Sequence, residues 1–282
     1  MEYVNLLTGI RRVGMDPKIA IIGNGFVGAA CSRGFKSLSQ YIIDPITHPD
    51  NTYKGLYDFN PQFIFVCVPT PMAVGGGIDV SGLVESVGSI DCPNAVIVIK
   101  STVIADIIND IYEDYDNVVY NPEFLREQYA DYDFENPTIR VMGGDIHNTV
   151  ALRNLYNDHT SSQIVSCHLT DVRTASWIKY SANAFLAMKV TFFNQMQDAF
   201  TGDDWPTFTR AMSADPRIGV THTQVPGPDG RRGYGGACFT KDINALNHHY
   251  DIPLLEEVSN INREYRSCYD PSEREISQKV VY

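Results

Sequence analysis

The sequence lacks the cysteine patterns of a metal site or a disulfide framework. Its six cysteines are scattered over 282 residues, and no two of them form a CxxC pair. In a chain of this length, isolated cysteines indicate reduced thiols and a cytoplasmic protein. We therefore expect no bound metal ion and no disulfide.

Long apolar runs and an excess of positive charge are also missing. No apolar run approaches the roughly 20 residues that a membrane-spanning helix needs. The 22 Lys and Arg residues are outnumbered by 34 Asp and Glu residues, which gives a net charge of −12. This balance disfavours a nucleic acid or an anionic membrane as partner, although local cations and helix N-termini can still bind a small anion.

What remains is the composition of an ordinary globular protein, with 44% hydrophobic and 20% charged residues. The length is sufficient for two domains. Residues 1–17 look like a short arm before the first strand, because they carry no long apolar segment of the kind found in secretory signals.

A glycine-rich turn lies between an apolar strand, expected at 18–22, and a helix that reaches residue 35. In this context the GxGxxG pattern indicates a dinucleotide site. Gly23 would make the tight turn, Gly25 would admit the pyrophosphate, and Gly28 would let the helix pack against the strand. The predicted cofactor contacts in the turn are Gly23, Gly25, Phe26, Val27 and Gly28.

An acidic residue, Asp44, follows the second expected strand, 41–43. A dinucleotide fold places an acid here to bind the hydroxyl groups of the adenosine ribose. Its carboxylate would repel a 2′-phosphate, so NAD is favoured over NADP. The alternative is that Asp44 and Pro45 only form a turn.

Two further strands, expected at 63–68 and 95–99, are apolar throughout, as in a parallel sheet covered on both faces. Thr70 and Thr102 follow their carboxyl ends, where open α/β sheets bind ligands. We expect these hydroxyl groups to lie near a nicotinamide or ribose, or to cap the next helices. Strands are also expected at 117–120 and 140–144, and the first domain should end near residue 170.

Two carboxylates, Glu123 and Glu127, follow the strand at 117–120. Because they are four residues apart, they would share one face if the segment were helical. An exposed acidic turn is the alternative.

Residues 171–200 form the longest expected helix, with apolar residues nearly all round, which predicts that most of it is buried. Lys179 and Asn183 stand four residues apart on this helix. A buried lysine is costly unless it has a partner or a function. An exposed polar stripe is the alternative.

A glycine- and proline-rich loop leads to Gly235-Gly-Ala-Cys-Phe-Thr-Lys-Asp242. Cys238 would be a nucleophile as its thiolate, which nearby positive charge or a helix N-terminus favours. The Asp242 carboxylate could hold a water molecule or act as a base. The alternative is that Cys238 is a small core residue. A helix is expected from 241 to about 265, with a break at Pro253.

Together these motifs resemble the nucleotide-sugar dehydrogenase family, most closely the UDP-glucose 6-dehydrogenases. The matching segments stand in the family's order at 23–28, 68–71, 100–103, 121–127, 179–187, 215–219 and 235–242. The resemblance implies an α/β protein in which a Rossmann-like parallel sheet, residues 1–170, precedes an all-helical central domain, residues 171–282. It also implies a homodimer formed through the long helix.

The resemblance further implies a reaction that serves polysaccharide biosynthesis. Members of the family oxidise a primary alcohol of a nucleotide sugar, such as UDP-glucose, to a carboxylate with two NAD in succession. Cys238 would attack the intermediate aldehyde to give a thiohemiacetal, and a second oxidation would give a thioester that water hydrolyses.

The resemblance assigns roles to the remaining residues. Lys179 and Asn183 would stabilise the oxyanion, Asp242 would position water or act as base, and Glu123 and Glu127 would supply acid and base function. Thr102 would be catalytic and, with Glu127 and Lys241, would line the NAD side; Arg217 would act across a dimer interface. The expected substrate contacts are Phe124, Leu125, Glu127, Lys179, Asn183, Arg217 and Gly236.

The chain also departs from the family pattern. Gln128 stands where glycine is usual, Thr240 where proline is common, and Gln195 where an acid is often found. We expect the usual third domain, which closes over the uridine diphosphate, to be absent. A second hypothesis is therefore a catalytically weak nucleotide-binding or assembly protein. A third is a two-electron enzyme of the hydroxyacid class, which has no need for Cys238.

Overall fold

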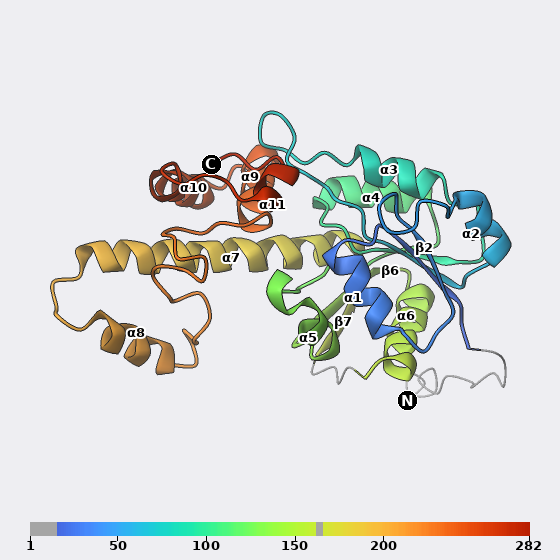
Figure 1. Ribbon diagram of the computed structural model, residues 1–282, viewed down its shortest axis with the longest axis horizontal. Coiled ribbons are helices and arrows are strands. Elements are labelled where there is room, and N and C mark those ends of the chain that lie inside the picture. The colour runs from blue at the N-terminus through green and yellow to red at the C-terminus, as the bar shows by residue number, and fades with distance from the viewer. Residues whose placement is uncertain (1–15, 162–165) are drawn as a thin grey trace.

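The computed structural model describes residues 16–161 and 166–282, and the expected arm at 1–17 lies almost wholly outside the described residues. The described strands form one sheet of seven, in the order β2-β1-β3-β4-β5-β6-β7. Figure 1 shows helices on both faces of this sheet and a long helix that leaves it. The strands are β1 (Ile19–Ile22), β2 (Gln40–Ile43), β3 (Phe63–Val66), β4 (Val96–Ile99), β5 (Val118–Tyr120), β6 (Arg140–Gly144) and β7 (Cys167–Thr170).

The first five strands run parallel, but β6 is antiparallel to β5, with Tyr120 opposite Gly143. β7 lies parallel to β6. The prediction of a parallel sheet therefore holds for β1 to β5 and needs correction at β6. Because β6 returns from the edge where the parallel strands end, it brings Arg140 to that edge.

The strands are apolar throughout because successive side chains point to opposite faces, and both faces are covered. In β1, Ile19 and Ile21 pack in one buried cluster, while Ala20 and Ile22 pack in the other. The first cluster includes residues of α1 (Phe26–Gly34), α5 (Ala130–Glu135) and α6 (Ile146–His159).

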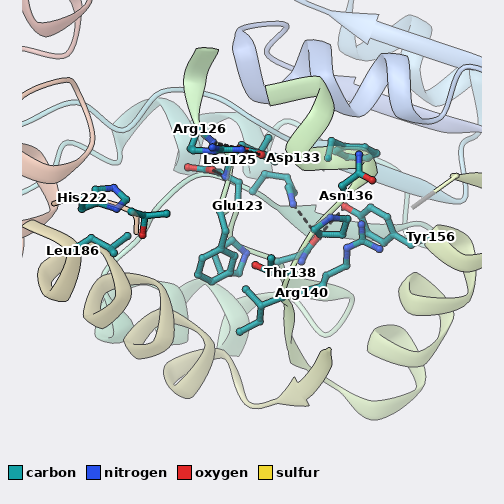
Figure 2. Close-up of a pocket in the computed structure, with 18 residues that line it drawn as sticks. Glu123, Leu125, Arg126, Asp133, Asn136, Thr138, Arg140, Tyr156, Leu186 and His222 are labelled. Carbon is teal, nitrogen blue, oxygen red and sulfur yellow. Dashed lines mark hydrogen bonds and ion pairs between the residues drawn. The ribbon is translucent and has the colours of Figure 1, made fainter. Parts of the chain in front are cut away.

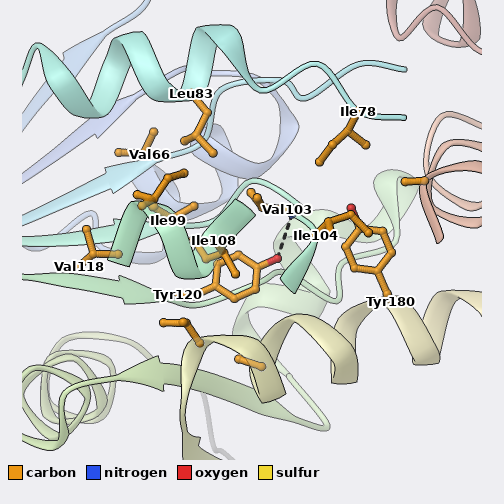
Figure 3. Packing of buried hydrophobic residues seen from close by; sticks show 14 of the residues in the cluster. Val66, Ile78, Leu83, Ile99, Val103, Ile104, Ile108, Val118, Tyr120 and Tyr180 are labelled. Carbon is orange, nitrogen blue, oxygen red and sulfur yellow. Dashed lines mark hydrogen bonds between the residues drawn. The ribbon is translucent and has the colours of Figure 1, made fainter. Parts of the chain in front are cut away.

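The second cluster joins the sheet to helices from both halves of the chain. It includes residues of α2 (Tyr53–Phe59), α3 (Ser81–Gly88), α4 (Ala105–Asp114), α7 (Val172–Ala199), α9 (Phe239–His249) and α10 (Pro253–Arg266). Figure 3 shows Tyr120 and Tyr180 in this cluster, where the Tyr120 hydroxyl accepts a hydrogen bond from the Val103 N–H over 3.1 Å.

The helix α7 is the element that connects the two halves. The Asp171 side chain caps its N-terminus by accepting a hydrogen bond from Thr174 N–H over 2.8 Å. The helix packs against α4 and β6, and also against α9 and α10. The chain turns back after α7, so that α8 (Trp205–Ala214) lies below the C-terminal half of α7 in the view of Figure 1, and α11 (Glu273–Ser277) lies near α9. The short helix η1 (Glu127–Tyr129) directly precedes α5. No helix in the described ranges is long and apolar enough to cross a membrane.

The expectation that α7 is mostly buried because it is apolar all round is only partly right. Phe185 and Phe192 are 58% and 46% exposed, while polar side chains such as Lys179 and Asn183 are buried. The break expected at Pro253 is confirmed, because α10 begins there.

Candidate active site

The glycine turn has the local geometry that a dinucleotide requires. Gly23 adopts φ +87°, and a Cβ on Gly28 would lie 1.9 Å from the Gly23 carbonyl oxygen, so α1 packs directly on the turn. Among residues 16–161 and 166–282, no atom apart from the chain neighbours lies within 4 Å of a Cβ built on Gly25, and no side chain caps the N-terminus of α1. Free helix N–H groups facing open space can bind a phosphate, so these residues fit NAD.

Asp44 stands at the end of β2, as predicted, and it also forms a turn. Its carboxylate accepts hydrogen bonds from Asn24 N–H at 2.8 Å and from the N–H groups of Ile46 and Thr47. Burial raises the pKa of Asp44, but these hydrogen bonds outweigh it and lower the pKa. Asp44 thus forms a turn, and a contact with the ribose stays a prediction.

Thr70 and Thr102 lie together beyond the strand ends. The Thr70 hydroxyl donates to the Thr102 carbonyl oxygen over 2.9 Å. Neither residue caps a helix, because α3 and α4 begin after Val80 and Ile104 without a side-chain cap. The capping alternative is therefore wrong, and a position beside the cofactor stays a prediction.

The buried polar residues of α7 meet two carboxylates. The Lys179 ammonium is 3.3 Å from Glu123 Oε1, and Asn183 Nδ2 donates to Asp242 Oδ2 over 2.6 Å. Lys241 Nζ lies 2.6 Å from the other Asp242 oxygen. All five side chains are buried, so the exposed polar stripe is excluded. Burial lowers the pKa of Lys179, but the charges of Glu123 and Asp242 outweigh it and raise the pKa, so this side chain stays charged.

Cys238 is the residue immediately before α9, as expected, and is half-buried. Burial and the carboxylates of Glu123 and Asp242 raise the pKa of its thiol to about 11, although Lys179 and Lys241 act in the opposite direction. The positive charges act in the predicted direction, but burial and the two carboxylates outweigh them, so the thiol of the ligand-free protein is protonated near neutral pH.

Glu123 and Glu127 do not share a helical face. Residues 121–126 form an extended loop, and the η1 helix begins only at Glu127. Glu123 is buried beside Lys179, while the Glu127 side chain is half exposed and pairs with Arg274 over 2.6 Å. The extended loop separates the two carboxylates, and only Glu123 joins the buried cluster.

The remaining predicted substrate residues have varied surroundings. Leu125 N–H donates to Glu123 Oε2 over 2.5 Å, and the Phe124 ring lies 5.3 Å from Lys179 Nζ. Gly236 N–H donates to Glu275 Oε1 over 2.8 Å. Arg217 pairs with Asp215, its side chain is 89% exposed, and within the described residues no hydrogen bond or ion pair joins it to the other predicted site residues.

A cavity of about 370 Å³ lies beside the buried cluster. The loop with Glu123, Phe124 and Leu125 borders it on one side, and Leu186 and His222 border another (Figure 2). Cys238 and Lys179 do not line it. A cavity of this size is large enough for part of a nucleotide-sized ligand.

Sequence reasoning missed several residues near the site. The cavity contains Lys100, which donates to Asn121 Oδ1 over 3.0 Å, and Arg140, whose guanidinium lies 3.6 Å from the centre of the Tyr156 ring. Arg274 and Glu275 were also missed. No motif marks these last two, because they come after the last segment that matched the family.

Comparisons with known proteins identify the family. Residues 58–160 match the NAD binding domain of the UDP-glucose/GDP-mannose dehydrogenase family, and residues 173–264 match the family's central domain. A UDP-glucose 6-dehydrogenase of Rickettsia bellii is 33% identical over 247 residues, which are 80% of this chain and 56% of that protein. A putative UDP-glucose 6-dehydrogenase of Bacillus subtilis is 30% identical over 298 residues, 87% of this chain and 67% of that one.

Solved structures show the same fold. A UDP-glucose dehydrogenase from Pyrobaculum islandicum matches with a TM-score of 0.73 and 22% identity, over 90% of this chain and 70% of that chain. A UDP-D-ManNAc dehydrogenase from Pyrococcus horikoshii matches with a TM-score of 0.73 and 20% identity, over 89% and 69%. The chain spans about half to two-thirds of the length of the relatives it matches. It belongs to the UDP-glucose/GDP-mannose dehydrogenase family and uses the NAD cofactor of that family.

Proposed function

We propose that the protein is an NAD-dependent oxidoreductase that converts the primary alcohol of a nucleotide sugar to a carboxylate through Cys238. One observation carries the proposal: Lys179, Asn183, Asp242 and Glu123 come from three separate segments and meet, buried, around this thiol. UDP-glucose is the proposed substrate, because relatives with 30% identity or more are named for it. Two NAD molecules, bound in succession, would each accept one of the two hydrides that the alcohol carbon loses.

The protein's own residues would handle protons and the oxygen charge. The Cys238 sulfur would add to the aldehyde carbon as its proton leaves, and the aldehyde oxygen would become the hydroxyl of a thiohemiacetal. Loss of a hydride and of the hydroxyl proton would give a thioester. Lys179 and Asn183 would donate hydrogen bonds to the oxygen in both stages.

Hydrolysis of the thioester needs a water molecule and a group that takes its proton. Asp242 accepts hydrogen bonds from both Asn183 and Lys241, so its position is fixed close to the thiol. We assign the water-positioning role to Asp242. The products would be the carboxylate and the free Cys238 thiol, which closes the cycle with no further reactant.

The surroundings of the site support two further parts of the proposal. The six thiols are free, which suits the reducing cytoplasm. Phe185 and Phe192 are seven residues apart on α7, so they share one exposed apolar stripe. We propose that a homodimer buries this stripe, and that Arg217 meets the substrate of the second subunit.

The test is the amount of NADH formed from a limiting amount of UDP-glucose. The full reaction gives two NADH for each sugar. Cys238→Ser should prevent completion, while Cys268→Ser, which changes an exposed cysteine, should leave it intact. Absence of NADH with UDP-glucose, GDP-mannose and UDP-N-acetyl sugars would favour a nucleotide-binding protein, and one NADH per sugar that is insensitive to Cys238→Ser would favour a two-electron enzyme.

A further inference from the structure

A short segment near the C-terminus, residues 272–282, packs against the loop that leads to Cys238. Ser272 and Glu275 form a capping box that starts α11. The Glu275 carboxylate accepts a hydrogen bond from Gly236 N–H over 2.8 Å, and Gly236 lies two residues before Cys238. The segment is therefore a direct neighbour of the thiol loop, although it comes after the residues that match the family's central domain.

The loop is held on both sides of the thiol by other elements. Asn262 of α10 accepts a hydrogen bond from Tyr234 N–H over 2.8 Å and donates one to the Tyr234 carbonyl oxygen over 3.0 Å. After the thiol, the Cys238 carbonyl oxygen accepts a hydrogen bond from Asp242 N–H over 2.9 Å. Residues 235–237 connect these two fixed points, so the path of this short stretch determines where the sulfur atom lies.

Glu275 holds the middle of that stretch. Gly236 adopts φ +80°, a conformation that glycine reaches without strain. In the described part of the chain, nothing apart from its neighbours in sequence lies within 4 Å of a Cβ built on Gly236. Because a glycine has no side chain to pack, the hydrogen bond from its N–H to the Glu275 carboxylate restrains this part of the loop.

The Glu275 carboxylate is itself well fixed. Oε2 accepts a hydrogen bond from Ser272 N–H over 2.6 Å, and the Tyr282 hydroxyl donates to Oε1. Burial raises the pKa of this carboxyl group, but the hydrogen bonds outweigh burial and lower the pKa to about 2, so the group is charged at neutral pH. A charged acceptor makes a stronger hydrogen bond with an N–H group than a neutral one does.

We propose that Glu275 is a positioning residue, which acts through Gly236 and keeps the Cys238 thiol in the buried cluster described above. This inference rests on the proposed function, in which the thiol reacts only after the first oxidation has produced an aldehyde. The first hydride leaves without help from the thiol, whereas the second requires the thiohemiacetal. Loss of the Glu275 hydrogen bond should therefore slow the second oxidation and not the first.

The first test measures the NADH formed from a limiting amount of UDP-glucose, with a hydrazine present to capture any aldehyde that leaves the site. The wild type should give two NADH for each sugar. Glu275→Ala should give close to one, with the remaining sugar recovered as captured aldehyde, while the single-turnover rate of the first oxidation changes by less than about twofold. Glu275→Gln keeps an acceptor for Gly236 N–H, so it should stay nearer to two.

The alternative is that Glu275 only stabilises α11. Ser272→Ala removes the side-chain cap of the same helix but keeps the acceptor for Gly236 N–H. It should lower the midpoint of thermal unfolding and still give two NADH for each sugar. A fall to one NADH in both Glu275→Ala and Ser272→Ala, or in neither, overturns the inference. Faster formation of the carboxylate by Glu275→Ala also overturns it, because the segment would then obstruct the site.

The second test is alkylation of Cys238 by iodoacetamide, which needs no substrate. Release of the loop should expose the thiol, so Glu275→Ala should raise the alkylation rate near neutral pH about tenfold or more, and Ser272→Ala should change it by less than about twofold. An unchanged rate in Glu275→Ala overturns the inference. A wild type that forms no NADH, while the alkylation rates differ as expected, refutes only the proposed function.

Discussion

The Cys238 thiol shows how two local effects compete at one residue. Its place before α9 favours the thiolate, yet burial and two neighbouring carboxylates raise the pKa to about 11. The resting thiol is protonated, which protects it from alkylation and oxidation. It follows that the thiol must lose its proton as it attacks. We propose that Asp242, which is buried, accepts this proton in addition to positioning the water molecule.

The rate of Cys238 alkylation should therefore rise with pH up to about 11 in the ligand-free protein. Iodoacetamide labelling followed by peptide mass spectrometry measures this rate, and the exposed Cys268 in the same sample serves as the control. A Cys238 rate that already levels off near neutral pH would contradict the raised pKa.

The Lys179–Glu123 pair gives a second test at the residue scale. Lys179→Met leaves the Glu123 carboxylate buried without its cation, which should lower the free energy of unfolding by about 3 kcal/mol or more. Adding Glu123→Gln should restore part of that loss. Denaturant unfolding of the single and double variants measures both effects.

The matched control lies on the same helix. Lys189 donates to the carbonyl oxygens of Ile218 and Gly219, and no ion pair with a carboxylate is found for it in the described residues. Lys189→Met should also destabilise the protein, but Glu123→Gln should not rescue it. If Glu123→Gln restored the same stability to Lys179→Met and to Lys189→Met, the Lys179–Glu123 pair would make no specific contribution to stability.

Among the elements, the junction of β1 and α1 depends on two glycines for different reasons. Gly28 lies against the backbone of Gly23, whereas Gly25 faces open space. The same motif therefore contains one position where the fold requires glycine and one where we expect a ligand to require it.

Replacing each of these two glycines by alanine should distinguish the position needed for folding from the position needed for ligand binding. Gly28→Ala should lower the free energy of unfolding by about 1–3 kcal/mol, because its methyl group overlaps a backbone oxygen. Gly25→Ala should change stability by less than about 1 kcal/mol, but should weaken NAD at least about tenfold by filling phosphate space. Thermal unfolding and calorimetric NAD titration measure the two effects, and a reversed pattern would refute this assignment.

α11 depends on a buried carboxylate. Burial raises the pKa of Glu275, but hydrogen bonds from the Tyr282 hydroxyl, Ser272 and Gly236 N–H outweigh it and lower the pKa from 4.5 to about 2. A lowered pKa in the folded state adds stability above the unfolded-state value, and this contribution disappears as the pH falls through the folded-state value.

The stability difference between wild type and Glu275→Gln should therefore be constant above pH 4.5 and should shrink as the pH falls toward 2. Chemical unfolding at several pH values measures it. Tyr282→Phe removes one hydrogen-bond donor to Glu275. Its stability should differ from that of the wild type in the same direction, but by less. A difference that does not depend on pH would show that the carboxylate is not charged in the folded protein.

The sequence predicted the elements whose residues carry a local signal. The glycine turn, the apolar strands and the long helix were found because their residue types determine backbone conformation directly. Contacts between distant segments were left open or mispredicted. The sequence left open whether Glu123 lies on a helix, and the structure places it in a loop where it pairs with Lys179. The strand β6 runs antiparallel although its composition resembles that of the other strands.

The residues of the candidate site could be predicted from motifs, but not their surroundings. Cys238, Lys179, Asn183 and Asp242 follow from motifs, but the raised pKa of the thiol depends on burial that no motif encodes. No motif predicts the packing at Gly235 either, where a Cβ would lie 2.5 Å from the Arg266 guanidinium. Arg274 and Glu275 could not be found, because their role depends on where the last segment docks.

At the scale of the whole molecule, we propose that the stripe with Phe185 and Phe192 forms the interface of a homodimer. Phe192→Asp places a charge in the proposed dimer interface, so it should raise the dimer dissociation constant at least about tenfold. Light scattering coupled to gel filtration over a range of concentrations measures it, and Ile146→Asp, at an exposed position on the distant helix α6, is the control. A wild-type protein that stays monomeric at all concentrations would refute the dimer.

The length of α7 has a mechanical consequence. The uninterrupted helix α7 carries Lys179 and Asn183. It also packs against β6 of the sheet and against α9, the helix that follows Cys238. A hinge motion between the half of the protein with the glycine turn and the half with Cys238 would have to bend α7. Folding therefore fixes the position of the thiol relative to the dinucleotide site. Mutations that loosen either half should lower the turnover rate more than they lower the affinity for ligands.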